Sequence, residues 1–516
     1  MRTQAGDGTG TRSSLRISSP LAILLLAWIG AIKATGSSFS AVALVDATSD
    51  LGLSPFMRGA CASAISLAIA ATAIAAGVAA DRLGRRRVLM GSFLVAGVAN
   101  LLIFAVPSGA VYFAGHIAAG VGYGAMATGS YAYVKALAPG KSLGWALGLF
   151  GVFTTLVCTV TVFAGGALAD ADWRWLFLIV PAMCVLAGVL VPRLLPVMPK
   201  VGSGPVDLPG LVLLGAGMLL LILGLTQATS SPTDPVTWAY VLAGVVLLVM
   251  WVVLELRSRH PSFPVRIFRS RFYLAAVLVG LTGNITVAAM TLGLSDHLQY
   301  IAGESVLAAT VGLQPSYIVG GVGGLVAGGL LAGRWLSTGV SPRLVMTLGP
   351  LVTAAGYALL IPLHHGSAYW MIMPGTILAG IGLAAMMTAQ GQVIVRAAPA
   401  EAYGAVTSSK TTIGQLGSAL GMILTILLLD RLTAGGVVRG LEKEGIGATD
   451  AHATLTSLDN YLTSGRRPGL HDLPDALGHA MSSFSGAFHW SMLICTGVMV
   501  ATAAAVWILM RERPGG

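Results

Sequence analysis

Long apolar runs recur along the whole chain, separated by short polar segments. Each run continues for about 20 residues, the length that a helix needs to cross the hydrocarbon core of a bilayer. The runs do not alternate between apolar and polar positions, and open sheet edges are not tolerated in lipid, so helices are the expected structure. Fourteen spans are predicted, near residues 21–43, 56–79, 87–106, 109–134, 142–168, 174–194, 208–228, 236–256, 272–294, 305–332, 343–363, 369–395, 402–429 and 486–510.

The composition favours a membrane protein over a soluble one. Hydrophobic residues make up 55% of the 516 residues and charged residues only 10%, against about 25% charged residues in ordinary soluble proteins. Such sparse charge also argues against an intrinsically disordered chain. Neither a disulfide framework nor a metal site is expected, and no cofactor is indicated, because the cysteines all lie in apolar runs: Cys61, Cys158, Cys184 and Cys495.

Lysine and arginine are unevenly distributed between the two sides of the predicted spans. If the N-terminus is cytoplasmic, most of the 30 basic residues fall in cytoplasmic segments, and the short outer loops hold only Arg58 and Arg174. The positive-inside rule therefore places both termini in the cytoplasm. The net charge of +10 is then an orientation signal, and no nucleic-acid partner is expected. The expected location is the inner or plasma membrane, and the excess of arginine over lysine favours a bacterial source.

The spans divide into two groups of six with a pair between them. The pair, near 208–228 and 236–256, is bracketed by cytoplasmic linkers, and Gly77–Arg82 has the same pattern as Gly329–Arg334 in the other half. Two six-helix halves built from repeats, with a site between them, describe a secondary transporter. The predicted parts are a cytoplasmic tail, an N-terminal half, the inserted pair, a C-terminal half and a second tail: 1–20, 21–195, 196–271, 272–510 and 511–516.

Glycines, one carboxylate and an arginine cluster are combined between the second and third spans. A carboxylate at a helix end, facing arginines across the cytoplasmic seam, predicts a charge latch that favours one state of alternating access. A plain positive-inside loop would explain the arginines, but not the acid and the glycines. The residues of this latch are Gly77, Asp81, Arg82, Gly84, Arg85 and Arg86, followed by Arg87.

This loop resembles the signature of the major facilitator superfamily between its second and third helices. Trp173–Phe177, Glu255–Arg257 and Gln415–Gly421 extend the likeness to the fourteen-helix drug:proton antiporter subfamily. The resemblance implies an all-α integral membrane protein with a major facilitator fold, in which two extra central helices join the six-helix halves. It also implies a proton-coupled exporter of small amphiphilic molecules that works by alternating access.

The chain departs from the subfamily pattern where that pattern carries proton coupling. Gly36-Ser37-Ser38 stands where an Asp-x-Thr stretch is usual in the first helix, and His116 replaces an arginine in the fourth. Of the Gly-Pro and Gly-Gly signature of the fifth helix only Gly165 and Gly166 remain, and packing is their expected role. The coupling chemistry of the family therefore cannot be transferred residue by residue.

Three basic residues lie within predicted spans and away from the span ends, where ionisable side chains are costly and are functional candidates. Lys33 is predicted to line a central cavity as a positive charge, unless it pairs with backbone carbonyls. His116 is a candidate for the cavity and for carrying the proton, unless it is a neutral residue bonded between helices. Lys410, with Thr411 and Gln415, is predicted to line the cavity from the C-terminal half, unless it extends to the headgroups.

None of the 20 acidic residues lies near the middle of a predicted span. Asp296, beside His297, is a candidate proton site at the cavity mouth, with a solvated turn as the alternative. A buried cation needs a carboxylate partner. The positive interior therefore favours anionic, zwitterionic or neutral amphiphiles as substrates.

Two further features bear on partners. Gly140-Lys141-Ser142 ends like a phosphate-binding loop, but Lys135 stands where the first glycine is required, so ATP is not expected. The outer loop 430–485 is predicted to be a loose linker or a contact for a periplasmic partner. The alternatives to drug or metabolite export are a lipid or anionic-metabolite exporter, an uncoupled facilitator, and a sensor or scaffold with a transporter fold. An enzyme is not expected.

Overall fold

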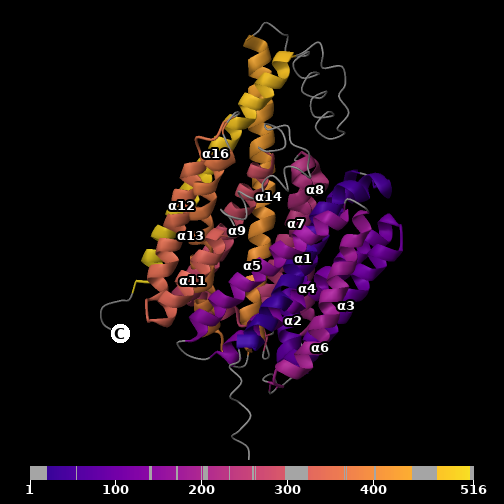
Figure 1. Ribbon diagram of the computed structural model, residues 1–516, viewed down its shortest axis with the longest axis vertical. Coiled ribbons are helices and arrows are strands. Elements are labelled where there is room, and N and C mark those ends of the chain that lie inside the picture. Colours follow the sequence, from indigo (N-terminus) through magenta and orange to yellow (C-terminus); the bar gives the residue numbers. More distant parts are fainter. Residues whose placement is uncertain are drawn as a thin grey trace, which may run out of the picture.

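The computed structural model describes residues 20–511, except 54, 139–141, 170–171, 199, 201–206, 232, 259–260, 262, 297–322, 365–366, 368, 400–401 and 444–473. Every regular element in this part of the chain is a helix, which confirms the predicted all-helical class (Figure 1). The elements of the N-terminal half are α1 (Pro20–Asp50), α2 (Pro55–Leu83), α3 (Arg85–Ala105), α4 (Gly109–Leu137), α5 (Ser142–Ala169), η1 (Trp173–Trp175) and α6 (Leu176–Leu194).

The inserted pair and the C-terminal half follow in the expected order. The pair consists of α7 (Leu208–Ser230) and α8 (Pro235–Arg257), followed by η2 (Val265–Arg269). The C-terminal half contains α9 (Arg271–Asp296), α11 (Gly323–Ser337), α12 (Pro342–Leu360), η5 (Tyr369–Met371), α13 (Ile372–Ala397), α14 (Tyr403–Lys443) and α16 (Pro474–Leu509).

Twelve helical segments of the described chain are long and apolar enough to cross a membrane. The other two helices, α4 and α11, are not among them. α11 has only 15 residues, and most of the predicted span 305–332 lies outside the described residues. α4 is rich in glycine and also carries serine, threonine and histidine, which lower its hydropathy, and it packs against α1, α2 and α3. The number of fourteen spans therefore stays a prediction.

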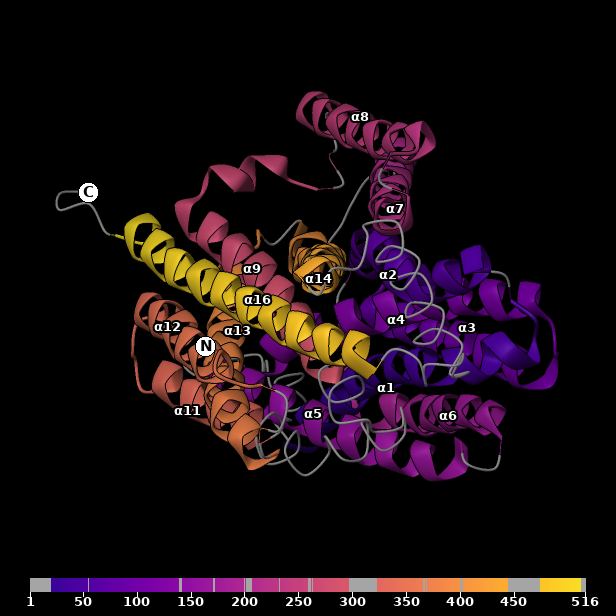
Figure 2. The same ribbon diagram turned by 90° about the horizontal axis from the view of Figure 1, so that it is seen from above.

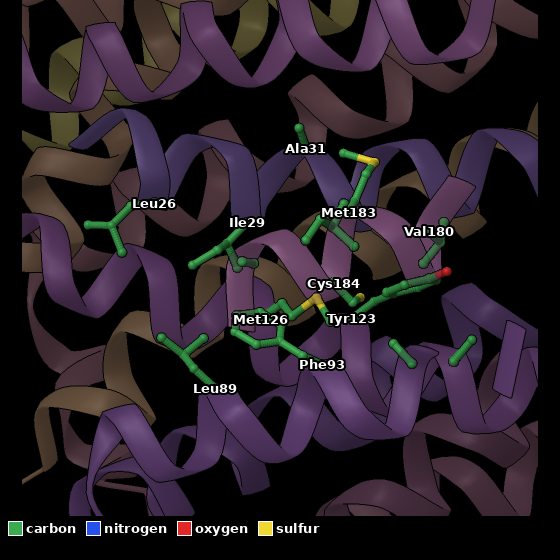
Figure 3. Close-up of a cluster of buried hydrophobic side chains, with 14 of the residues drawn as sticks. Leu26, Ile29, Ala31, Leu89, Phe93, Tyr123, Met126, Val180, Met183 and Cys184 are labelled. Carbon is green, nitrogen blue, oxygen red and sulfur yellow. The ribbon is translucent and has the colours of Figure 1, made fainter. Parts of the chain in front are cut away.

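The N-terminal half has its own apolar core. Leu26 and Ile29 of α1 lie near Phe93 of α3, Met126 of α4 and Met183 of α6 (Figure 3), and all five are buried. Because these side chains come from four helices, this core holds α1, α3, α4 and α6 together.

The two halves lie side by side, and α14 of the C-terminal half packs against α2 of the N-terminal half (Figure 2). α7 packs against both α2 and α14, through a small cluster that includes Leu67, Ala70 and Ile222, while α8 lies farther out. The inserted pair therefore covers one side of the boundary between the halves.

α14 and α16 extend beyond their predicted spans and project from one end of the molecule (Figure 1). The segment 430–443, predicted to belong to an outer loop, continues α14 as an amphipathic helix in which Val437 and Leu441, one turn apart, are buried. A Cβ at Gly436 would overlap the side chain of Ser483, so α14 and α16 approach closely here. The middle of the predicted loop lies outside the described residues.

Candidate functional site

A cavity of about 310 Å³ lies between the two halves. α4 and α5 line it on one side, and α9, α11, α13 and α14 line it on the other. The volume falls at the lower end of the range of small-molecule sites. Among the described residues that line it, only Lys410 is charged; the others are Tyr131, Leu147, Phe150, Gly151, Val152, Thr155, Asn284, Val287, Met290, Thr291, Gly329, Thr376, Gly380, Leu383, Ala384, Met387 and Thr388.

The ammonium of Lys410 is held inside the protein by contacts from both halves. Its Nζ donates hydrogen bonds to the Tyr131 hydroxyl at 2.9 Å and to the Met387 carbonyl at 3.4 Å. The same Nζ lies 4.3 Å from the centre of the Tyr131 ring, and this ring packs edge-on against Phe150 at 5.7 Å. Gly391 of α13 provides the space, because a Cβ there would overlap the Tyr131 hydroxyl. Tyr131 belongs to α4, so this contact joins the halves.

Lys33 lies in a different place, between α1 and α5. It is half-buried in the middle of α1 and neighbours Cys158, which also lies close to Thr35 and Ser38. The hydroxyls of Thr35 and Thr161 are 2.6 Å apart and tie the two helices together. Lys33 thus belongs to a polar strip within the N-terminal half and does not line the cavity.

His116 is buried in the interior of the N-terminal half. Its Nδ1 lies 2.6 Å from the Tyr112 carbonyl, and its ring packs against those of Tyr112 and Phe177 at 4.3 and 5.7 Å. Its Nε2 has no hydrogen-bond partner in the described part of the chain. The cavity does not reach His116, whose role as a proton carrier stays a prediction.

The remaining predicted site residues do not line the cavity either. Thr411 and Gln415 are half-buried on α14, outside the cavity wall. Asp296 is the last residue of α9, and its side chain, together with His297, lies outside the described part. Of the residues predicted for the substrate site, the structure brings only Lys410 to the cavity.

The polar groups around Lys410 were not predicted. Tyr131, Asn284 and Thr388 are polar side chains in apolar spans, and a polar group in such a span can mark a site. An uncharged polar residue is common in such spans, however, and the sequence does not show which helices face one another. Gly391 carries no recognisable signal by itself.

One seam between the halves closes the end of the molecule that carries Arg82, Arg85, Arg86 and Arg87, which we call the arginine end. Here the backbone N–H of Gly404 donates to Asp81 Oδ2 at 2.6 Å. The first N–H groups of a helix lack intrahelical partners, and α14 begins at Tyr403. Asp81 of α2 therefore caps α14 across the boundary, with its charge at the positive end of the helix dipole.

Arg85 supports the same seam. Its guanidinium lies 3.6 Å from Asp81 Oδ1, donates to the Ala132 carbonyl at 3.4 Å, and stacks 4.9 Å from the centre of the Tyr403 ring. The turn between α2 and α3 requires Gly84, whose φ of 100° disfavours other residues. Arg82 and Arg86, also predicted for the latch, are half-buried.

A second seam at the same end joins α5 to α11 through glycines. A Cβ at Gly148 would lie 2.6 Å from the Gly329 carbonyl, and one at Gly333 would lie 3.1 Å from the Gly144 carbonyl. The repeated segments of the sequence, Gly77–Arg82 and Gly329–Arg334, thus occupy equivalent seams. In the second segment Gly333 takes the position that Asp81 has in the first segment. The second seam is therefore a close approach of two backbones without a carboxylate.

Gly165 and Gly166 differ in their surroundings. A Cβ at Gly165 would overlap the ring of Phe39 and lie 2.8 Å from Leu176 Cδ2, whereas one at Gly166 meets no described atom within 4 Å. Gly165 therefore permits the close packing of α5 against α1 and α6. Gly166 has no such contact.

Two helical halves with a cavity between them, closed at one end by two seams, are typical of a secondary transporter. The family model of the Major Facilitator Superfamily matches residues 26–422, and the chain belongs to this family. This confirms the predicted superfamily.

Individual relatives agree in fold and class. The chain is 29% identical to the puromycin resistance protein pur8 of Streptomyces alboniger over 92% of this chain and 87% of that one. It is 25% identical to the multidrug efflux pump LfrA of Mycolicibacterium smegmatis, over 87% of each. The solved structure of the proton:xylose symporter XylE covers 96% of each chain with a TM-score of 0.60 at 12% identity, which shows the shared fold.

Proposed function

We propose that this protein exports small amphiphilic molecules, such as drugs or secondary metabolites, across the cell membrane of a bacterium. The arginine end and both termini face the cytoplasm. The observation that carries this proposal is the largely apolar cavity between the halves, closed on the arginine side by residues of both halves. Relatives named for puromycin resistance and multidrug efflux support the direction and the substrate type.

α14 links the cavity to the seam. Gly404 binds Asp81, and Lys410, six residues later, lies about 9 Å along the same helix at 1.5 Å per residue. In the cytoplasm-closed state these contacts hold α14 against α2 and α4. Release of both lets the halves rock apart and exposes the cavity to the cytoplasm, where substrate enters. The outer extension of α14 and α16 is available to a periplasmic partner.

Flux in energised inside-out vesicles tests export directly. Vesicles that contain the protein are expected to accumulate an amphiphilic dye above the level of vesicles without it, and removal of the ion gradients should collapse the uptake. Ethidium as a cation and anilinonaphthalene sulfonate as an anion cover both charges. If neither dye accumulates above the control, the protein is not an exporter of amphiphiles. The alternative of a sensor or scaffold with a transporter fold is then favoured.

The proton gradient is the proposed energy source, with His116 as the candidate carrier. His116→Ala is then expected to abolish uphill uptake of the transported dye, because the proton carrier is lost, and to leave downhill exchange intact. The matched control is His489→Ala on α16 of the C-terminal half, where Nε2 lies 2.7 Å from the Leu363 carbonyl of the same half. Uphill pumping at the normal rate in His116→Ala vesicles would show that another group carries the proton. Asp296 is the other candidate.

A further inference from the structure

Two hydrogen-bond donors that lie close together beside the cavity, at Lys410 and Tyr131, remain available to a ligand. The Lys410 ammonium has three N–H groups, and two of them are directed at the Tyr131 hydroxyl and the Met387 carbonyl. Since the Tyr131 oxygen accepts from Lys410, its own proton is left to be donated, and no described acceptor takes it. The two parent atoms are 2.9 Å apart, so the free N–H and O–H suit two oxygens of one acidic group.

Three of the four threonines that line the cavity do not offer such donors. Thr155, Thr376 and Thr388 donate to carbonyls of their own helices at 3.0, 3.0 and 2.7 Å, so their oxygens face a ligand as acceptors. Asn284 uses one amide N–H on the Gly280 carbonyl at 2.7 Å. The one charged donor among the described lining residues is Lys410, and the Tyr131 hydroxyl lies beside it.

Nothing in the described cavity neutralises the charge of Lys410. No aspartate or glutamate is among the lining residues, and Asp81 is engaged by Gly404 and Arg85 in the seam. A buried ammonium with only neutral partners is costly. A cationic ligand would add repulsion, whereas an anionic ligand supplies the missing partner.

The rest of the cavity is suited to an apolar body. Leu147, Phe150, Val287, Met290 and Leu383 line the walls beyond the polar pair. One acidic group at Lys410 and an apolar body against these walls describe an amphiphilic anion.

We infer that Lys410 and Tyr131 bind the acidic group of an anionic amphiphile, and that such anions are the substrate class that the protein exports. This inference rests on the proposed export function and specifies it. An inside-negative membrane potential also favours export of one negative charge. At equilibrium it raises the ratio of outside to inside anion concentration about 50-fold per 100 mV. The potential aids export whether or not a proton moves inward.

The test uses two probes that share a ring system and differ in charge, naphthalenesulfonate and naphthylmethyl-trimethylammonium, loaded into proteoliposomes of the full chain. Naphthalenesulfonate is expected to leave the proteoliposomes faster than the ammonium probe does. Its efflux should become faster still when the lumen is made electrically negative. Lys410→Met should slow its efflux at least about tenfold, and Tyr131→Phe about three- to tenfold, as expected for loss of hydrogen bonds to a charged group. Lys410→Arg keeps the charge and should retain more efflux than Lys410→Met.

Lys443→Met is the matched control, because it makes the same change at the exposed end of α14. As a second readout, naphthalenesulfonate should raise the thermal unfolding temperature of the wild type but not of Lys410→Met. The inference is overturned if only the ammonium probe moves, or if Lys410→Met and Lys443→Met export naphthalenesulfonate equally well. If neither probe nor ethidium moves faster than in protein-free liposomes, the proposed export function itself fails.

Discussion

Replacing Gly77 by alanine is expected to reduce export strongly, because α2 and α14 then close the arginine end less readily. A Cβ at Gly77 would overlap the Gly404 carbonyl and lie 2.8 Å from Ser408 Oγ. The carbonyl belongs to the first turn of α14 and cannot rotate away as a side chain can, so the helices must separate. Overpacking of this kind costs about 1–3 kcal/mol, which lowers the ratio of closed to open protein about 5- to 150-fold.

Labelling of a cysteine introduced in place of Ser408 measures the change in the ratio of closed to open protein. Ser408 is fully buried on the face of α14 that meets Gly77. In a background without the native cysteines, Ser408→Cys should react slowly with an impermeant maleimide in inside-out vesicles, and much faster when Gly77→Ala is added. Gly97→Ala is the control, since its methyl group would lie 3.9 Å from Cys184 Cβ, an ordinary contact. Equal labelling and equal transport in both glycine variants would show that the seam does not govern the cycle.

The fold could be predicted from the sequence, and Asp81 could be singled out, because each has a strong local signal. A bilayer imposes a minimum length on apolar runs, so the runs themselves mark most of the helices. The latch combines Asp81 with glycines and arginines, a set that a simple orientation signal does not require. Its partner, Gly404, was not predicted, because the sequence does not state which helix the carboxylate caps.

The cavity was harder to predict for a physical reason. In water, the apolar stripe of a helix marks the face that is buried. In lipid, both the outer face and the packed face are apolar, so the rotation of a span about its axis leaves little trace in the sequence. Lys33, His116 and Lys410 all lie deep in spans, yet only Lys410 faces the boundary between the halves. The depth of a side chain in the membrane follows from counting residues along the span. The direction in which it faces depends on neighbouring helices that are distant in the chain.

Asp81→Asn is expected to weaken the same seam without adding bulk. The substitution removes the charge that accepts the Gly404 N–H at 2.6 Å and faces Arg85 at 3.6 Å, and it leaves Arg85 buried without its partner. Hydrogen bonds to charged groups contribute about 1.5–3 kcal/mol, so the open state should gain about 10- to 150-fold. Transport should fall several-fold, and labelling of Ser408→Cys should rise about tenfold or more.

Two comparisons separate this latch from a general loss of stability. Asp234→Asn makes the same change at a carboxylate that caps α8 by accepting from the Val236 N–H at 2.9 Å, within the inserted pair rather than across the halves. It should leave labelling and transport unchanged. Arg85→Gln should add little to Asp81→Asn, because both act on one interaction and such effects are not additive. Full additivity, or equal effects of Asp81→Asn and Asp234→Asn, would mean that Asp81 stabilises α2 alone and does not hold the halves together.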